Sequence, residues 1–96
     1  MILHTLSAAP GDSVYLDCLR FVGEEDALLL VGSGVYGALK GSASEAALLD
    51  CGARLFILSA HAEAAGVRDV SGLFTMLDMA GFVTLTEQYP RQLAWH

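Results

Sequence analysis

Ala27-Leu28-Leu29-Leu30-Val31, followed directly by Gly32-Ser33-Gly34, is the stretch of sequence that decides the fold. The run contains no polar side chain, and the glycines end it. A short apolar run bounded in this way is typical of a strand that is covered on both faces, which occurs mainly in parallel sheets with helices above and below. We therefore expect residues 27–31 to form a strand inside a parallel sheet.

Outward from this stretch, apolar segments alternate with segments of helical periodicity. Strands are expected over 2–6, 27–31, 54–59, 73–77 and 92–95, and helices over 13–22, 35–39, 42–49, 61–65 and 81–89. The alternation predicts the α/β class, as a small open parallel sheet of about five strands flanked by helices on both faces. A single domain would span residues 1–96. Sites in such sheets lie beyond the carboxyl ends of the strands, here at 7–10, 32–34, 59–61 and 78–81.

Composition adds expectations about partners. The chain is 54% hydrophobic but only 17% charged, which predicts a subunit that buries apolar surface against a partner. Eleven acidic residues against five basic ones give a net charge of −6, which disfavours direct binding to nucleic acid or to an anionic membrane. No signal peptide or membrane-spanning stretch is evident, so we expect a cytoplasmic protein with reduced thiols.

A glycine pattern follows the decisive strand. Residues 32–37 match G-x-G-x-x-G, the arrangement that brings backbone amides up to a pyrophosphate in dinucleotide-binding domains. The pattern follows the second strand rather than the first, and no acid stands at the end of the third strand to bind a ribose. A tight turn with close packing is therefore the favoured interpretation. A small nucleotide- or anion-binding module using Gly32–Gly37, with the amides of residues 33–35 holding an anion, is the alternative.

The two cysteines are too few and too far apart for a disulfide framework or a zinc site. Cys18 falls in the middle of a predicted helix with no cation on its side, which favours an inert thiol over a reactive one. Cys51 lies at a predicted helix end beside Asp50, and both the helix dipole and the carboxylate should raise its pKa.

The histidines do not have the spacing of metal ligands, and we expect no metal or cofactor. His4 lies within a predicted strand, where a structural role is favoured over a catalytic one. Ser59 and His61 are close in sequence and raise the idea of a small hydrolase, but the sharp turn that presents a nucleophilic serine is missing. The residues alone therefore predict an α/β subunit that is not itself an enzyme.

The ordered set of segments at both ends and in the middle of the chain resembles the DsrH/TusB family of sulfur-relay subunits. The segments that carry the resemblance are Ile2-Leu3-His4-Thr5-Leu6, Gly34-Val35-Tyr36-Gly37-Ala38-Leu39, Leu77-Asp78, Ala80-Gly81-Phe82-Val83, Leu85-Thr86 and Gln92-Leu93-Ala94-Trp95. Two positions depart from the pattern: Ser33 stands where many members have Asp, and Met79 where many have Tyr. These departures leave details of an interface or sulfur path at those positions open.

The resemblance implies a DsrE-like fold and an accessory place in a heterohexamer with two DsrE-like sister subunits, of the TusC/TusD or DsrE/DsrF kind. In a TusBCD-like complex, persulfide sulfur passes from a TusA-like carrier to a TusE-like one and toward 2-thiolation of the tRNA wobble uridine. In a DsrEFH-like complex, which works with DsrC, the pathway is sulfur oxidation. An isolated copy of the chain could self-associate through the surface that the sisters cover.

The resemblance also reopens the role of Cys18. Cys18-Leu19-Arg20-Phe21 matches the Cys-Leu-Lys-Phe stretch of DsrH-type members, whose cysteine is a proposed sulfur site. Cys18 is thus a candidate persulfide carrier, against the inert thiol that its local sequence favours. The complex would be a sulfurtransferase, while this subunit alone would not be catalytic.

Overall fold

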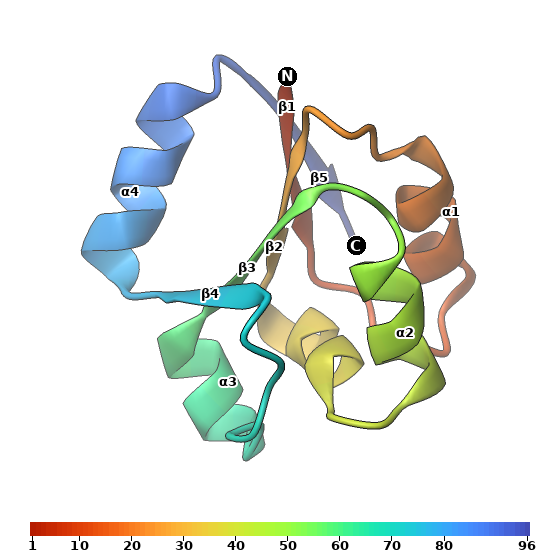
Figure 1. Cartoon of the computed structure of the whole chain (residues 1–96). Helices are drawn as coiled ribbons and strands as arrows, with labels where there is room; N and C mark the ends of the chain where they lie inside the picture. Colours follow the sequence, from red (N-terminus) through yellow and green to blue (C-terminus); the bar gives the residue numbers. More distant parts are fainter.

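Five parallel strands form a single sheet at the centre of the molecule (Figure 1). The computed structural model describes residues 1–96. The strand order is β4-β3-β2-β1-β5, and every neighbouring pair is parallel. The strands are β1 (Ile2–Leu6), β2 (Ala27–Leu30), β3 (Arg54–Leu58), β4 (Phe74–Leu77) and β5 (Arg91–Trp95). The α/β class and the parallel sheet predicted from the sequence are confirmed.

Helices cover the two faces of this sheet unequally. The helical elements are α1 (Ser13–Phe21), the 3₁₀ helix η1 (Gly32–Ala38), α2 (Ala43–Leu49), α3 (Ser59–Ala65) and α4 (Met79–Gln88). From β1 to β4 each connection steps to the next strand along the sheet, whereas the connection through α4 returns across the sheet to place β5 beside β1. Figure 1 shows α4 alone on one side and α1 and α2 on the other.

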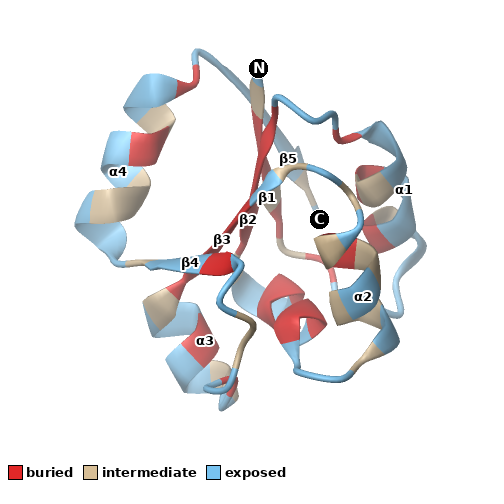
Figure 2. Cartoon of the chain, in the orientation of Figure 1, coloured by how far each residue is buried: buried red, intermediate tan, exposed pale blue.

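Two apolar cores result, one on each face. The larger cluster has 15 buried residues from the sheet, α1, η1, α2 and α3 and the segments beside them, and the smaller has 7, mainly from the sheet and α4. All of β2 is buried, with Leu28 and Leu30 in the larger core and Ala27 and Leu29 in the smaller one (Figure 2). The apolar run that predicted a doubly covered strand is thus explained by its central place in the sheet.

Side-chain caps set where the helices begin. Asp12 accepts a hydrogen bond from the Val14 amide (3.0 Å) at the start of α1. At the start of α2, the Ser42 hydroxyl accepts from the Glu45 amide (3.1 Å), and the Glu45 carboxylate accepts in return from the Gly41 amide (3.0 Å). Asp78 accepts from Gly81 (2.7 Å) at the start of α4.

Several predicted boundaries were wrong. The α-helix expected over 35–39 is instead a 3₁₀ helix that begins at Gly32. α4 begins at Met79 rather than at residue 81, because the Asp78 side chain caps the helix two residues earlier than its glycine suggests. α3 begins at Ser59, directly after β3, rather than at residue 61. Other ends agree with the predictions to within one residue, as expected for frayed boundaries.

Candidate functional site

An open pocket lies at the carboxyl edge of the sheet, where β2 leads into η1 and β3 leads into α3. It has a volume of about 340 Å³, and its lining residues are Gly32, Ser33, Tyr36, His61, Ala64 and Ala65. η1 and α3 bring its two halves together from segments far apart in the sequence. The pocket therefore occupies two of the four strand ends at which the sequence predicted a site.

The glycine pattern that lines this region is explained by close packing. A Cβ atom on Gly34 would overlap the Leu6 carbonyl oxygen, and one on Gly37 would overlap the Tyr15 hydroxyl. Both glycines are buried. The second and third glycines therefore allow η1 to lie directly against β1 and α1, which is the packing interpretation favoured from the sequence.

The predicted cradle of amides for an anion does not form in this turn. The Gly34 amide, the middle one of the three expected donors, donates to the Val31 carbonyl (2.9 Å). The Gly32 amide donates to His61 Nδ1 (2.8 Å). The middle amide of the predicted three is therefore already used within the turn.

His61 is oriented by the backbone and not by Ser59. Since Nδ1 accepts from the Gly32 amide, the ring proton resides on Nε2. Ser59 lies beside a different hollow, lined also by Glu63, Val67, Arg68 and Met76, and makes no hydrogen bond to His61. The structure therefore does not assemble the nucleophile and base of the hydrolase idea.

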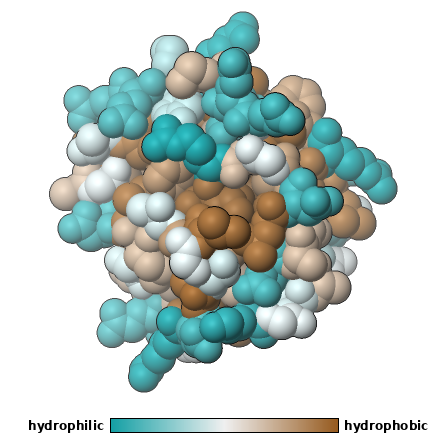
Figure 3. Space-filling view, viewed as in Figure 1, coloured by the Kyte–Doolittle hydropathy of each residue, from teal (hydrophilic) through white to brown (hydrophobic).

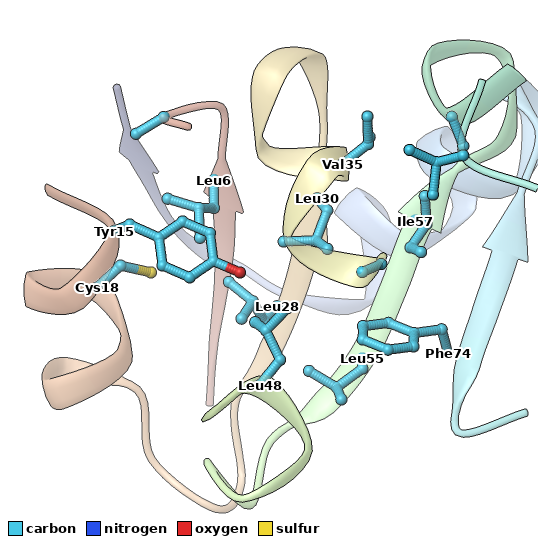
Figure 4. Close-up of a cluster of buried hydrophobic side chains, with 14 of the residues drawn as sticks. Leu6, Tyr15, Cys18, Leu28, Leu30, Val35, Leu48, Leu55, Ile57 and Phe74 are labelled. Atoms are coloured by element: carbon cyan, nitrogen blue, oxygen red, sulfur yellow. The ribbon is translucent and has the colours of Figure 1, made fainter. Parts of the chain in front are cut away.

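Cys18, the candidate persulfide carrier, lies in the larger core. Its side chain is 0% exposed, and Figure 4 shows its sulfur beside the Tyr15 ring, pointing inward. Burial raises the pKa of the Cys18 thiol to about 12, with a further rise from the charge that Cys51 would carry. A thiol must ionise and be reached by its partner to carry sulfur, so this conformation of Cys18 is that of an inert thiol.

Cys51 lies at the end of α2 and is only partly buried. Burial raises the pKa of its thiol most, and the Asp50 carboxylate raises it further, against hydrogen bonds to backbone amides that lower it. The upward direction predicted from the sequence is confirmed, but burial rather than Asp50 is the main cause. No cation lies near enough to favour a thiolate at either cysteine.

His4 belongs to a buried chain of hydrogen bonds that joins three strands or their flanks. Trp95 Nε1 donates to His4 Nδ1 (3.0 Å), and His4 Nε2 donates to Asp26 Oδ2 (2.9 Å). The Asp26 carboxylate also accepts from the Ile2 and Gly23 amides, each at 2.9 Å. Burial alone would raise the pKa of Asp26, but these hydrogen bonds lower it to about 2. The histidine is 0% exposed, so its role in this network is structural, as favoured from the sequence.

The two positions that depart from the family pattern are both exposed. Ser33 lines the pocket at the carboxyl edge. Met79 is the first residue of α4 and is 60% exposed.

The sequence analysis did not single out Tyr36, which lines the pocket at the carboxyl edge. Tyr36 lies in the 3₁₀ helix η1, and this geometry has no sequence signal of its own.

No group of three or more His, Cys, Asp or Glu side chains is arranged to hold a metal ion. None of the helices combines the length and the apolar character that crossing a membrane would require. The pocket at the carboxyl edge is the candidate site that the fold predicts, and its polar side chains are those of His61, Ser33 and Tyr36.

Comparison with known structures shows the fold class. The chain matches the crystal structure of the ychN protein from E. coli with a TM-score of 0.81 and 13% sequence identity, over 98% of this chain and 97% of that one. It matches the solution structure of Tm0979 from Thermotoga maritima with a TM-score of 0.70 and 21% identity, over 92% and 93% of the two chains. The chain is thus a small parallel α/β protein with the DsrE-like fold expected from the sequence.

Sequence comparison shows the family. The family model described as "DsrH like protein" matches residues 9–92. Protein TusB of Pectobacterium parmentieri is 39% identical over 95 residues, which are 98% of this chain and all of that protein. The TusB proteins of Yersinia pestis and Photorhabdus laumondii are 37% and 30% identical over the same shares. The chain belongs to the DsrH family, and the resemblance noted in its sequence is confirmed.

Proposed function

We propose that this chain is an accessory subunit of a cytoplasmic, heterohexameric sulfur-relay complex of the TusBCD kind. The complex would pass persulfide sulfur from a TusA-like to a TusE-like carrier, toward 2-thiolation of the tRNA wobble uridine. The observation that carries the proposal is the match of nearly the whole chain to TusB proteins, at 39% identity in the Pectobacterium parmentieri protein. The DsrH family match over residues 9–92 supports the same class of function.

The state of the cysteines supports an accessory role. Persulfide transfer proceeds by attack of a thiolate on a sulfur atom, as in thiol–disulfide exchange. Cys18 is fully buried and its pKa is raised to about 12, and the pKa of Cys51 is raised as well. We therefore place the sulfur-carrying cysteine on a DsrE-like sister subunit and leave this chain to bind and position it.

The alternative role is that of a DsrH-type subunit in a sulfur-oxidation complex, with Cys18 as a sulfur carrier. The Cys18-Leu19-Arg20-Phe21 stretch favours it. In that role α1 would have to move away from the sheet, because the thiol faces the core. Sulfur labelling of this chain within the assembled complex tests the alternative. If this chain carries as much label in a Cys18→Ser variant as in the wild type, the alternative is contradicted and the accessory role is left intact.

Exposed apolar side chains at the β4 edge of the sheet favour docking there. Leu73 is 69% exposed just before β4, Met76 is 43% exposed within it, and Met79 is 60% exposed just after it. Figure 3, viewed as in Figure 1 with β4 toward the viewer, shows apolar side chains gathered in the middle of the molecule, with hydrophilic ones around them. An open edge strand bordered by apolar surface is what a partner subunit would cover.

Co-expression with two DsrE-like sister chains, followed by light scattering on the purified material, tests the assembly. The expected result is a stable complex near the mass of two copies of each chain. A monomer of this chain in the presence of both sisters would contradict the proposal.

A pair of matched variants tests the docking edge. Leu73→Asp places a charge at the β4 edge, and Leu16→Asp places the same charge on the outer surface of α1, where Leu16 is 51% exposed. We expect the Leu73 variant to lose the complex and the Leu16 variant to keep it. Equal behaviour of the two variants would contradict docking at β4. Circular dichroism of each variant alone verifies that both remain folded.

A further inference from the structure

The pocket at the carboxyl edge contains three polar groups that have no partner within the protein. They are the Ser33 hydroxyl, the Tyr36 hydroxyl and Nε2 of His61. The rest of the wall consists of Gly32, Ala64 and Ala65, whose small size leaves the polar groups accessible. The pocket thus combines free hydrogen-bonding groups with room for a small ligand.

His61 determines which hydrogen-bonding group a ligand in this pocket must present. Its ring is anchored because Nδ1 accepts from the Gly32 amide (2.8 Å). The opposite nitrogen, Nε2, therefore carries a proton and acts only as a donor. A ligand that meets this nitrogen must present an acceptor atom, and the Ser33 and Tyr36 side chains, which line the same pocket, carry two further hydroxyl donors.

The charge around the pocket favours an anionic acceptor. None of the lining residues is acidic, although the chain carries 11 acidic residues and a net charge of −6. Hydrogen bonds to an ionised acceptor are about twice as strong as those between neutral groups. An anion therefore gains more from these three donors than a neutral carbonyl would, and it meets no carboxylate in the pocket.

We propose that His61, Ser33 and Tyr36 form a binding subsite for a small anionic group. Two sources share this chemistry: the terminal sulfur of a persulfide or sulfide, and an oxyanion such as phosphate. The donors are side chains, in place of the backbone amides that the glycine pattern suggested. The sulfur source rests on the proposed sulfur-relay role, whereas the oxyanion source does not, and the titration of the isolated chain is independent of assembly with sister subunits.

An NMR titration of the ¹⁵N-labelled full chain tests the subsite. One series adds hydrosulfide under anaerobic conditions, and a separate series adds inorganic phosphate. The expected result is saturable shifts of the Ser33, Tyr36 and His61 resonances with at least one anion. The anion that binds more tightly identifies the sulfur or the oxygen source. Shifts that do not saturate with either anion, or that centre elsewhere on the chain, would overturn the proposal.

Variants identify the donors. Tyr36→Phe removes one hydroxyl from an exposed ring and should weaken binding about ten- to a hundredfold, the range expected for one hydrogen bond to a charged acceptor. His61→Ala should weaken it further, and His96→Ala, a histidine outside the pocket, should leave it unchanged. Wild-type affinity in both the Tyr36 and His61 variants would refute the subsite. The Tyr36 variant keeps the Gly32–His61 hydrogen bond, so its result does not depend on any rearrangement caused by removing the imidazole.

Discussion

Replacement of Asp26 by asparagine should destabilise the fold at neutral pH and remove a large part of its sensitivity to acid. The Asp26 carboxylate accepts hydrogen bonds from the Ile2 and Gly23 amides and from His4 Nε2, each at 2.9 Å. Burial acts to raise the pKa of this carboxyl, but the hydrogen bonds to its charged form outweigh burial and lower the pKa to about 2.

The magnitude follows from the difference in pKa between the folded and unfolded chains. An unfolded Asp has a pKa of about 3.9, and each pKa unit corresponds to about 1.4 kcal/mol, so the carboxylate contributes about 2–3 kcal/mol. The side chain is only 11% exposed, so solvent screens this contribution little. Because the folded pKa is the lower one, the stabilisation is complete above about pH 5 and is lost as the pH falls toward 2.

Urea denaturation measures the contribution of the Asp26 carboxylate to the free energy of unfolding. The wild type and Asp26→Asn are compared at a series of pH values from 7 to 2. The gap in free energy of unfolding between the two proteins should narrow by about 2 kcal/mol between pH 5 and 2, since half of the folded-state carboxyls are still ionised at a pH equal to their pKa. Asp17→Asn is the control, because the Asp17 side chain is 59% exposed and lies 3.9 Å from Arg20 in a surface pair. That variant should stay within about 0.5 kcal/mol of the wild type. A gap that does not change with pH would refute the argument.

Three further predictions concern the larger core. Tyr15→Phe should raise the free energy of unfolding by about 1 kcal/mol, because the Tyr15 hydroxyl is buried with no hydrogen-bond partner; a lower melting temperature would contradict this. Gly37→Ala should lower stability by about 1–3 kcal/mol through overlap with that hydroxyl, and adding Tyr15→Phe should recover part of the loss in thermal melts. In a Cys51→Ala variant, Cys18 should react with iodoacetamide at pH 8 only in urea, since its side chain is 0% exposed in the folded protein; rapid alkylation of the folded protein would show that α1 opens.

The sheet was predictable because its signals are local. The apolar run at 27–31 lies in the middle of the sheet, and the alternation of strands and helices determines parallel pairing. The sequence was a poorer guide to where three of the helices begin. The carboxylate of Asp78 caps α4 two residues before the glycine at which the helix is expected to begin, and a 3₁₀ helix that begins at Gly32 stands in place of the expected α-helix.

The site was predictable only in part. The carboxyl edge of the sheet follows from topology, and the chain does have its pocket there. The donors could not be assigned, because the hydrogen bond between Gly32 and His61 joins residues 29 positions apart. The same limit applies to His4: a structural role was foreseen, but its partners lie 22 and 91 positions away. Contacts at such separations depend on the completed fold and leave no local pattern.

The position of β5 has a consequence for how the chain is made. β5 is the last strand of the sheet in sequence, yet it pairs along the whole of β1, the first. During synthesis β1 can therefore pair with β2 while its other edge stays open until residues 91–95 have left the ribosome. For that interval a nascent chain exposes unpaired backbone beside an incomplete core, where another chain's strand can add. The hydrogen bond from Trp95 to His4 marks the end of that exposure, because it forms only when β5 has reached β1.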